Sequence, residues 1–210
     1  MSLGSNAVHV AALCGSLRGS DSYTRRALAI CAEEMIASGA VVDLIDLAPL
    51  DLPFCESAQD TEEHPGTLQL KARVKAANAI LLGSPEYHNS FSGVLKNALD
   101  LLSADELRGK LFGLLGVGGG EVGAINTLGH LRYVVRGVGG WSLPVQVSIA
   151  HAYKAFDGGR LRDPKLDQKI RAFAKELVRF ARIYAIEPKV EPKLAEVIDR
   201  DPAETRRRTT

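Results

Sequence analysis

A cluster of hydroxyl side chains and one arginine lies between residues 15 and 24, in the stretch GSLRGSDSYT. An apolar run of strand length comes before this stretch, and an amphipathic helical pattern follows it. The first N–H groups of a helix have no partner within the helix, and the helix dipole adds partial positive charge there. Hydroxyl groups and an arginine at that position suit a phosphate dianion. The stretch therefore predicts a phosphate-binding loop, with a capped helix start after a polar turn as the alternative interpretation.

Two common phosphate loops are excluded because their motifs are missing. The chain contains no G-x-x-x-x-G-K-[ST] of the ATPase type, and no G-x-G-x-x-G dinucleotide fingerprint opens the first helix. A loop that relies on hydroxyl groups is more typical of one phosphate group held by one loop, as in FMN. The sequence also lacks the G-x-S-x-G of serine hydrolases and any His, Cys, Asp or Glu cluster with ligand spacing. We therefore predict no metal site.

The composition is that of a single globular domain. Of the 210 residues, 46% are hydrophobic and 24% are charged, which is ordinary for such a domain. The formal net charge of +1 argues against a nucleic-acid partner. Three cysteines without a C-x-x-C motif favour a reducing compartment. Neither a signal-peptide pattern nor an apolar run that could span a bilayer is found, so we predict a cytoplasmic protein with no membrane partner.

The pattern along the chain predicts five strands that alternate with five helices. The strands are expected at residues 8–13, 41–47, 79–84, 111–117 and 141–149. The helices are expected after residue 23 and at about 64–77, 94–102, 124–135 and 164–186, with polar loops at 85–93 and 150–164. This alternation predicts an α/β fold, with a parallel sheet, helices on both faces and right-handed crossovers. Residues 1–187 would form this domain, and residues 188–210 a charged, flexible extension.

Three unusual loops follow the first, third and fourth predicted strands. They lie at residues 15–24, 85–93 and 117–123. The carboxyl ends of parallel strands meet at one edge of the sheet, and ligands bind there near the switch point of the topology. The three loops are therefore expected to form one site.

Taken together, GSLRGSDSYT, SPEYHNSFSGVLKNALD and GVGGGEVG resemble the NAD(P)H-dependent FMN reductase family of the flavodoxin-like superfamily. The most specific element runs from Pro85 to Asp100, where P-E-Y is followed within a few residues by S-G-x-L-K-N-A-x-D. The family includes FMN reductases, quinone reductases, azoreductases and chromate-reducing enzymes. The resemblance covers about residues 8–183. It implies a flavodoxin-like doubly wound sheet of five parallel strands in the order 2-1-3-4-5.

The resemblance also assigns residues to a noncovalently bound FMN. The phosphate would be held by Ser16, Arg18, Ser22, Tyr23 and Thr24. The flavin ring and ribityl chain would lie along Pro85, Glu86, Tyr87, His88 and Asn89. The pyrimidine end of the ring would border Gly118, Gly119 and Gly120, where missing side chains let backbone N–H groups approach carbonyl oxygens.

Alternative interpretations remain open for single residues of this site. Many members of the family have Asn directly after the Tyr, whereas this chain has His88 and then Asn89, so either of the two faces the flavin. Glu86 is equally consistent with an acid that satisfies a helix start, and Tyr87 with packing. Lys96 and Asn97 are assigned to the helix scaffold rather than to the site.

The activity that the resemblance implies is a two-step, ping-pong hydride transfer. NADPH or NADH reduces the flavin and leaves, and a small-molecule acceptor then takes the electrons in the same space. Quinones, azo dyes, free flavin and metal oxyanions are the candidate acceptors. The flavin carries this chemistry, so no catalytic side chain is predicted. The family also implies a homodimer or homotetramer. The alternative is a flavodoxin-like electron carrier, which the near-neutral charge disfavours because flavodoxins tend to be strongly acidic.

Overall fold

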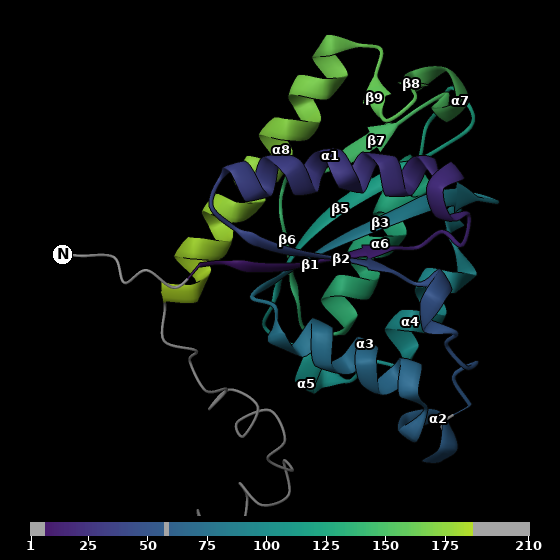
Figure 1. Ribbon diagram of the computed structural model, residues 1–210, viewed down its shortest axis with the longest axis vertical. Coiled ribbons are helices and arrows are strands. Elements are labelled where there is room, and N and C mark those ends of the chain that lie inside the picture. Colours follow the sequence, from purple (N-terminus) through teal and green to yellow (C-terminus); the bar gives the residue numbers. More distant parts are fainter. Residues whose placement is uncertain (1–6, 57–58, 187–210) are drawn as a thin grey trace, which may run out of the picture.

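A parallel sheet forms the centre of the computed structural model, which describes residues 7–56 and 59–186 (Figure 1). The strand order is β2-β1-β3-β5-β6, and β7 pairs with the other end of β5. The bounds of these strands are His9–Cys14 for β1, Val41–Asp46 for β2, Ala79–Tyr87 for β3, Leu111–Val117 for β5, Trp141–Ser142 for β6 and Val147–Ile149 for β7. Because β6 and β7 together occupy the fifth place, the predicted order 2-1-3-4-5 is confirmed. The predicted extension at 188–210 lies outside the described residues.

Helices cover both faces of the sheet. Figure 1 shows α1 (Tyr23–Ala37) and α8 (Pro164–Ile186) above the sheet and α3 (Pro65–Ala76) and α4 (Gly93–Asp100) below it. Helix α6 (Ile125–Gly137) packs on the same face as α3 and α4. The shorter elements are α2 (Gln59–Glu63), α5 (Ala104–Leu107), α7 (Ala152–Ala155), and the 3-10 turns η1 (Gly19–Asp21) and η2 (Ala48–Leu50).

Two hydrophobic clusters fill the space between the sheet and these helices. Val10, Ala12 and Cys14 of β1 belong to the cluster under α1 and α8. Their neighbours Ala11 and Leu13 belong to the cluster on the side of α3, α4 and α6. Successive side chains of a strand point to opposite faces, so a strand covered on both faces is apolar at every position. This explains the continuous apolar runs that predicted the inner strands.

The fifth predicted strand is interrupted in the structure. The guanidinium of Arg132 on α6 binds four acceptors, one at the end of β6 and three in the segment between β6 and β7. It donates to Gln146 Oε1 at 2.7 Å, Ser142 Oγ at 3.0 Å, and the carbonyl oxygens of Leu143 and Pro144 at 2.9 and 2.8 Å. Proline has no N–H to give to a strand ladder. The sequence interpretation of one continuous strand was therefore wrong at its centre.

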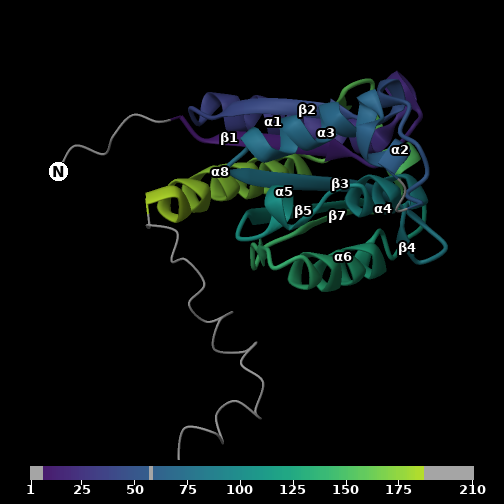
Figure 2. The same cartoon turned by 90° about the horizontal axis from the view of Figure 1, so that it is seen from below.

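The segments at 85–93 and 150–164 are not plain loops. Strand β3 continues to Tyr87 and pairs with β4 (Ser90–Phe91), so PEYHNSFS forms a hairpin. The turn residues His88 and Asn89 have φ of +51° and +63°, as a two-residue hairpin turn with matching twist requires. Figure 2 shows this turn projecting beyond α4 and α6. The later segment contains α7 and a second hairpin, β8 (Phe156–Asp157) with β9 (Arg160–Leu161).

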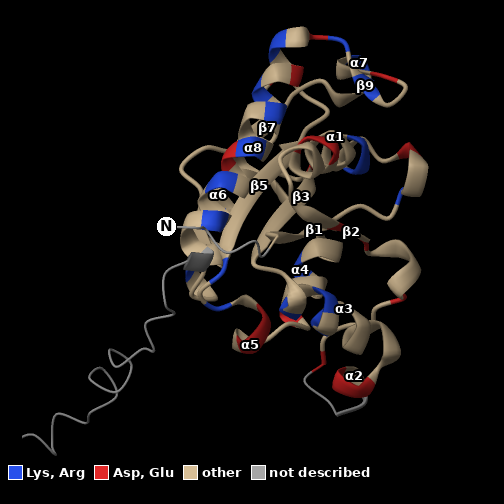
Figure 3. Cartoon of the chain, turned by 60° about the vertical axis from the view of Figure 1, so that its left-hand side comes forward, with Lys and Arg blue, Asp and Glu red and all other residues tan. Residues whose placement is uncertain are grey.

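The charged surface carries both signs. On the face in Figure 3, Lys and Arg residues lie along α8, and Asp and Glu residues lie on α2 and α5. Within the described ranges, no helix is both long and apolar enough to cross a bilayer. No group of three His, Cys, Asp or Glu side chains in the same ranges could hold a metal ion.

Candidate functional site

Ser92 joins two of the three predicted loops at the carboxyl edge of the sheet. Its side chain is buried and caps α4, where Oγ accepts the N–H of Leu95 at 3.2 Å. The same hydroxyl donates to the carbonyl oxygen of Gly15 at 2.6 Å, and the Ser92 N–H donates to Ser84 Oγ at 3.0 Å. The first loop and the hairpin are therefore bound to each other. Sequence reasoning missed Ser92, although a serine three residues before Leu95 at the start of a helical pattern is an N-cap signature.

The first loop presents unpartnered backbone donors at the start of α1. Ser22 is the N-cap of α1, and its Oγ accepts the N–H of Arg25 at 3.1 Å. Among the described residues, the N–H groups of Gly19, Ser20, Tyr23 and Thr24 have no hydrogen-bond acceptor. Ser16 is buried, and its Oγ accepts the N–H of Arg18 at 3.4 Å. The capped helix start and the phosphate loop, which were alternatives in the sequence, are compatible in this geometry.

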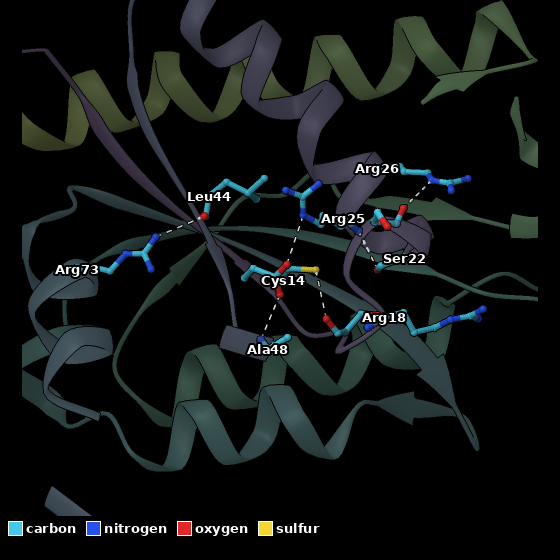
Figure 4. A network of polar contacts seen from close by, with 11 residues as sticks. Cys14, Arg18, Ser22, Arg25, Arg26, Leu44, Ala48 and Arg73 are labelled. Carbon is cyan, nitrogen blue, oxygen red and sulfur yellow. Dashed lines mark hydrogen bonds and ion pairs between the residues drawn. The ribbon is translucent and has the colours of Figure 1, made fainter. Parts of the chain in front are cut away.

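Charges around the first loop favour an anion. Arg18 is exposed and extends away from the other labelled residues of Figure 4, and none of the described residues forms an ion pair with it. The Asp21 side chain is 80% exposed and lies 4.0 Å from Arg26, so this carboxylate is turned toward a cation and solvent. The loop therefore combines a free guanidinium with free N–H groups at a helix start.

One of the predicted phosphate residues, Tyr23, has its side chain engaged elsewhere. The ring of Tyr23 stacks on Phe156 of β8, with ring centroids 5.6 Å apart and an angle of 22° between the planes. The guanidinium carbon of Arg26 lies 5.3 Å from the centroid of the same ring. Thr24 is buried. The structure thus places the ring of Tyr23 in packing and the N–H groups of both residues among the free donors.

The hairpin is attached to α6 by two side-chain contacts. Glu86 Oε2 accepts the N–H of Thr127 at 2.9 Å, so this carboxylate caps the start of α6. Ser90 Oγ lies 3.0 Å from His130 Nδ1. Glu86 therefore satisfies a helix start, as one of the two sequence interpretations expected. The helix is α6, which lies much later in the chain. Pro85 is buried at the end of β3, whereas Tyr87, His88 and Asn89 are exposed at the tip of the hairpin.

The glycine loop is held from behind by residues 149–152. The Gly118 N–H donates to the carbonyl oxygen of Ile149 at 2.8 Å, and the Gly118 carbonyl accepts the Ala152 N–H at 3.0 Å. A Cβ atom on Gly118 would lie 2.0 Å from the carbonyl oxygen of Gly123, so only glycine fits there. Gly119 and Gly120 border open space, and within the described chain their N–H groups have no acceptor.

The expected scaffold residues of α4 make structural contacts. Lys96 forms an ion pair with Asp100 at 2.7 Å. Asn97 donates from Nδ2 to the carbonyl oxygen of Pro53 and accepts the N–H of Cys55, each at 2.9 Å. The helix thereby holds the segment that follows β2, and these contacts are consistent with the assignment of both residues to the scaffold.

Cys14 lies next to the phosphate loop but is not a nucleophile. Burial raises the pKa of its thiol to about 11, and the Sγ atom lies 3.9 Å from the carbonyl oxygen of Ser16 (Figure 4). The thiolate is the reactive form of cysteine, so this side chain is inert near neutral pH.

The donors of the site fit the two polar parts of FMN. Free N–H groups, hydroxyls and Arg18 suit a phosphate dianion at the start of α1. The free N–H groups of Gly119 and Gly120 suit ring carbonyl oxygens, because no side chain blocks their approach. The first set of donors follows β1 and the second follows β5. These strands lie on either side of β3, so both sets are at the same edge of the sheet.

Comparisons with known proteins identify the family of this chain. A family model described as NADPH-dependent FMN reductase matches residues 8–154. An NADPH azoreductase of Bacillus sp. (strain OY1-2) is 34% identical over 142 residues, which cover 68% of this chain and 76% of the relative. An FMN-dependent NADPH-azoreductase of Staphylococcus saprophyticus is 35% identical over 148 residues, with 67% and 78% covered.

Solved structures support the fold. The flavoenzyme FerB of Paracoccus denitrificans, an NAD(P)H:(acceptor) oxidoreductase, superposes with a TM-score of 0.72 at 24% identity, over 85% of this chain and 99% of that one. An archaeal flavodoxin superposes with a TM-score of 0.58 at 14% identity, over 83% and 98%. At these identities the likeness shows the flavodoxin-like fold. The family model, in contrast, spans well over half of the sequence, so the chain belongs to the NADPH-dependent FMN reductase family and is an NAD(P)H-dependent oxidoreductase that uses FMN.

Proposed function

We propose that NAD(P)H and a small-molecule electron acceptor use the three-loop site in turn, in a ping-pong reaction. FMN, when bound, supplies the chemistry, because it accepts a hydride and passes on the electrons. The observation that carries the proposal is the pairing of two sets of free donors, one at the start of α1 and one on the glycine loop. The chain itself binds and orients the flavin.

Each loop has a separate proposed role. The first loop, with Arg18 and the hydroxyls of Ser16 and Ser22, binds the phosphate and makes FMN bind more tightly than a flavin that lacks it. The N–H groups of Gly119 and Gly120 bind ring carbonyl oxygens and favour negative charge on the pyrimidine end, as an oxyanion hole does. The hairpin forms a wall along the ring, with the tip at His88 and Asn89 exposed to the second substrate.

Azo compounds are the acceptor class that we propose to test first. Two relatives of about 35% identity are named as NADPH azoreductases, and both names specify NADPH as the reductant. Quinones, free flavin and metal oxyanions are the other candidates. The exposed hairpin tip at Tyr87, His88 and Asn89 is the part of the site that we propose to contact these acceptors.

The proposed assembly is a homodimer or homotetramer in the cytoplasm. Tyr87 is 51% exposed at the tip of a hairpin that projects from the sheet, and large aromatic side chains are enriched at interfaces between subunits (Figure 2). Cys14 and Cys31 are buried free thiols and Cys55 is a partly exposed one, which suits a reducing compartment.

The first experiment is an absorbance spectrum of the purified protein after incubation with FMN and desalting, repeated after anaerobic addition of NADPH. Retained flavin bands that bleach with NADPH support the reductase. Retained bands that bleach only with NADH also support the reductase and identify NADH as its reductant. Bands that neither nucleotide bleaches favour the electron carrier, and no retained flavin together with no binding in a titration refutes the proposed function.

A further inference from the structure

His151 lies next to the glycine loop, and the function described above gives its side chain no role. It follows β7 by two residues, so it lies at the same carboxyl edge of the sheet as the three loops. Its N–H donates to the carbonyl oxygen of Gly120 at 3.1 Å, and the next N–H, from Ala152, donates to Gly118. The backbone of His151 therefore touches the part of the loop whose N–H groups are free.

The backbone of His151 is strained. Its φ of +46° and ψ of +49° place it in the left-handed region, which costs a residue with a Cβ free energy and occurs mostly at glycine, asparagine or aspartate. Of the three other non-glycine residues with positive φ in the described ranges, His88 and Asn89 form the hairpin turn of the same site, and Asp51 ends η2. Such strain gathers at functional sites, where the surrounding structure maintains it.

The imidazole of His151 has an unpartnered polar atom. Its Nδ1 is buried and has no hydrogen-bond partner, although the side chain is only partly buried as a whole. The edge-to-face contact with Tyr153, at 6.4 Å between ring centroids, involves the ring and leaves Nδ1 unpaired. The side chain does not cap α7 either. A buried imidazole nitrogen without a partner destabilises the protein unless something else satisfies it.

A second unpartnered atom lies just after the glycine loop in the chain. Thr127 Oγ1 is buried without a partner in the first turn of α6, which begins just after that loop. Of the three buried side-chain atoms without partners in the described residues, two therefore flank this loop. Thr127 is fully buried, whereas the His151 side chain is only partly buried, so His151 is the one of the two that a ligand at this loop can satisfy.

We propose that His151 is a further flavin-binding residue, whose Nδ1 pairs with the polar pyrimidine edge of bound FMN beside Gly120. This inference rests on the proposed placement of FMN at the three loops. The pyrimidine edge carries both carbonyl acceptors and an N–H donor, so Nδ1 can pair with it in either imidazole tautomer. The ring rather than the phosphate is the expected partner, because β5 and β7 lie at the far side of β3 from the phosphate loop of β1.

The test compares His151→Gly with the wild type and with Lys154→Ala, a control on an exposed side chain of the same short helix. Glycine adopts the left-handed region without strain and removes the unpaired nitrogen, so the free energy of unfolding of the apoprotein should stay the same or rise. The affinities for FMN and for riboflavin, which lacks the phosphate, should both fall about tenfold, as the loss of one hydrogen bond predicts. His151→Asn, which tolerates the same backbone and keeps a polar group, should recover part of both affinities.

Three results would overturn the inference. The first is an unchanged FMN affinity in His151→Gly. The second is a loss for FMN with none for riboflavin, which would assign His151 to the phosphate. The third is a drop in apoprotein stability as large as the loss of binding, which would make the imidazole a structural element. A wild-type protein that binds no FMN refutes the proposed function itself, so the two failures are distinguishable.

Discussion

Replacing Gly118 by alanine should open the glycine loop. The new Cβ atom would lie 2.0 Å from the Gly123 carbonyl oxygen and 2.4 Å from its carbon, whereas ordinary contacts begin at 3.4 Å. The loop would have to move by about 1.4 Å, because both clashing atoms belong to the backbone and cannot rotate away. A movement of that size breaks the hydrogen bonds that join Gly118 to Ile149 and Ala152, which are 2.8 and 3.0 Å long.

The expected magnitude follows from those two hydrogen bonds. Each contributes about 1 kcal/mol, so Gly118→Ala should lower the free energy of unfolding of the apoprotein by about 2 kcal/mol. If flavin binding requires the closed loop, the same cost appears in the dissociation constant for FMN, which should rise about 30-fold. Denaturation with urea in the absence of flavin measures the first value, and titration of FMN fluorescence measures the second.

Gly119→Ala is the matched control. Its Cβ would meet no protein atom within 4 Å, so the stability of the apoprotein should not change. If the flavin ring approaches this position as proposed, the added methyl group should still weaken FMN binding. Wild-type stability and wild-type affinity in Gly118→Ala would refute the assigned role of the loop, and unchanged affinity in Gly119→Ala would show that the ring lies elsewhere.

Other predictions concern the phosphate loop, the hairpin and the buried thiols. Arg18→Ala should weaken FMN binding by about 1.5–3 kcal/mol and leave riboflavin binding unchanged, since Arg18 is expected to contact only the phosphate; equal losses for both ligands in parallel titrations would contradict this. Glu86→Ala should lower the free energy of unfolding by about 1 kcal/mol, because the Thr127 N–H at the start of α6 loses its acceptor, and urea denaturation that matches the wild type would exclude the cap. Burial raises the pKa of Cys31 from 9.0 to about 12, so the neutral thiol contributes stability that is complete below pH 9 and is lost as the pH rises toward 12. Between pH 9 and 12, the free energy of unfolding should therefore fall less steeply with pH in Cys31→Ala than in the wild type, by about 1.4 kcal/mol per pH unit. Identical slopes in the two proteins would rule this out.

The sequence predicts the main architecture because burial on both faces leaves a direct pattern. Strand β5 is apolar at every position, and β1 and β3 are apolar from Val10 to Cys14 and from Ala79 to Gly83, which is the pattern of strands that helices cover on both faces. The interruption of the fifth strand has one local signal, Pro144, which has no N–H for a strand ladder, but its stabilisation is not visible in the local sequence. It depends on the Arg132 side chain, which comes from a different element and satisfies four acceptors that the local sequence leaves unpaired.

The candidate site is predictable only where its residues leave a signal in the local sequence. Ser22 and the glycines are recognisable because a helix cap and a missing side chain are local properties. The contact of Glu86 with α6 joins residues 41 positions apart, and the bond from Ser92 to Gly15 joins residues 77 apart. His151 leaves no local signal, because its strain and its unpaired nitrogen exist only when β7 lies beside the glycine loop.

The interruption between β6 and β7 also divides the edge of the sheet into two units. Strand β6 pairs only with Leu111 and Phe112, whereas β7 pairs with Leu115 to Val117. Two residues of β5 and four residues of the edge lie between these ladders, so the hydrogen bonds of one do not continue into the other. The edge can therefore open locally in two steps, and β7 can separate with α7 and the glycine loop while β6 stays paired. A bound flavin would then slow amide hydrogen exchange at β7 and leave β6 exchanging at its own rate.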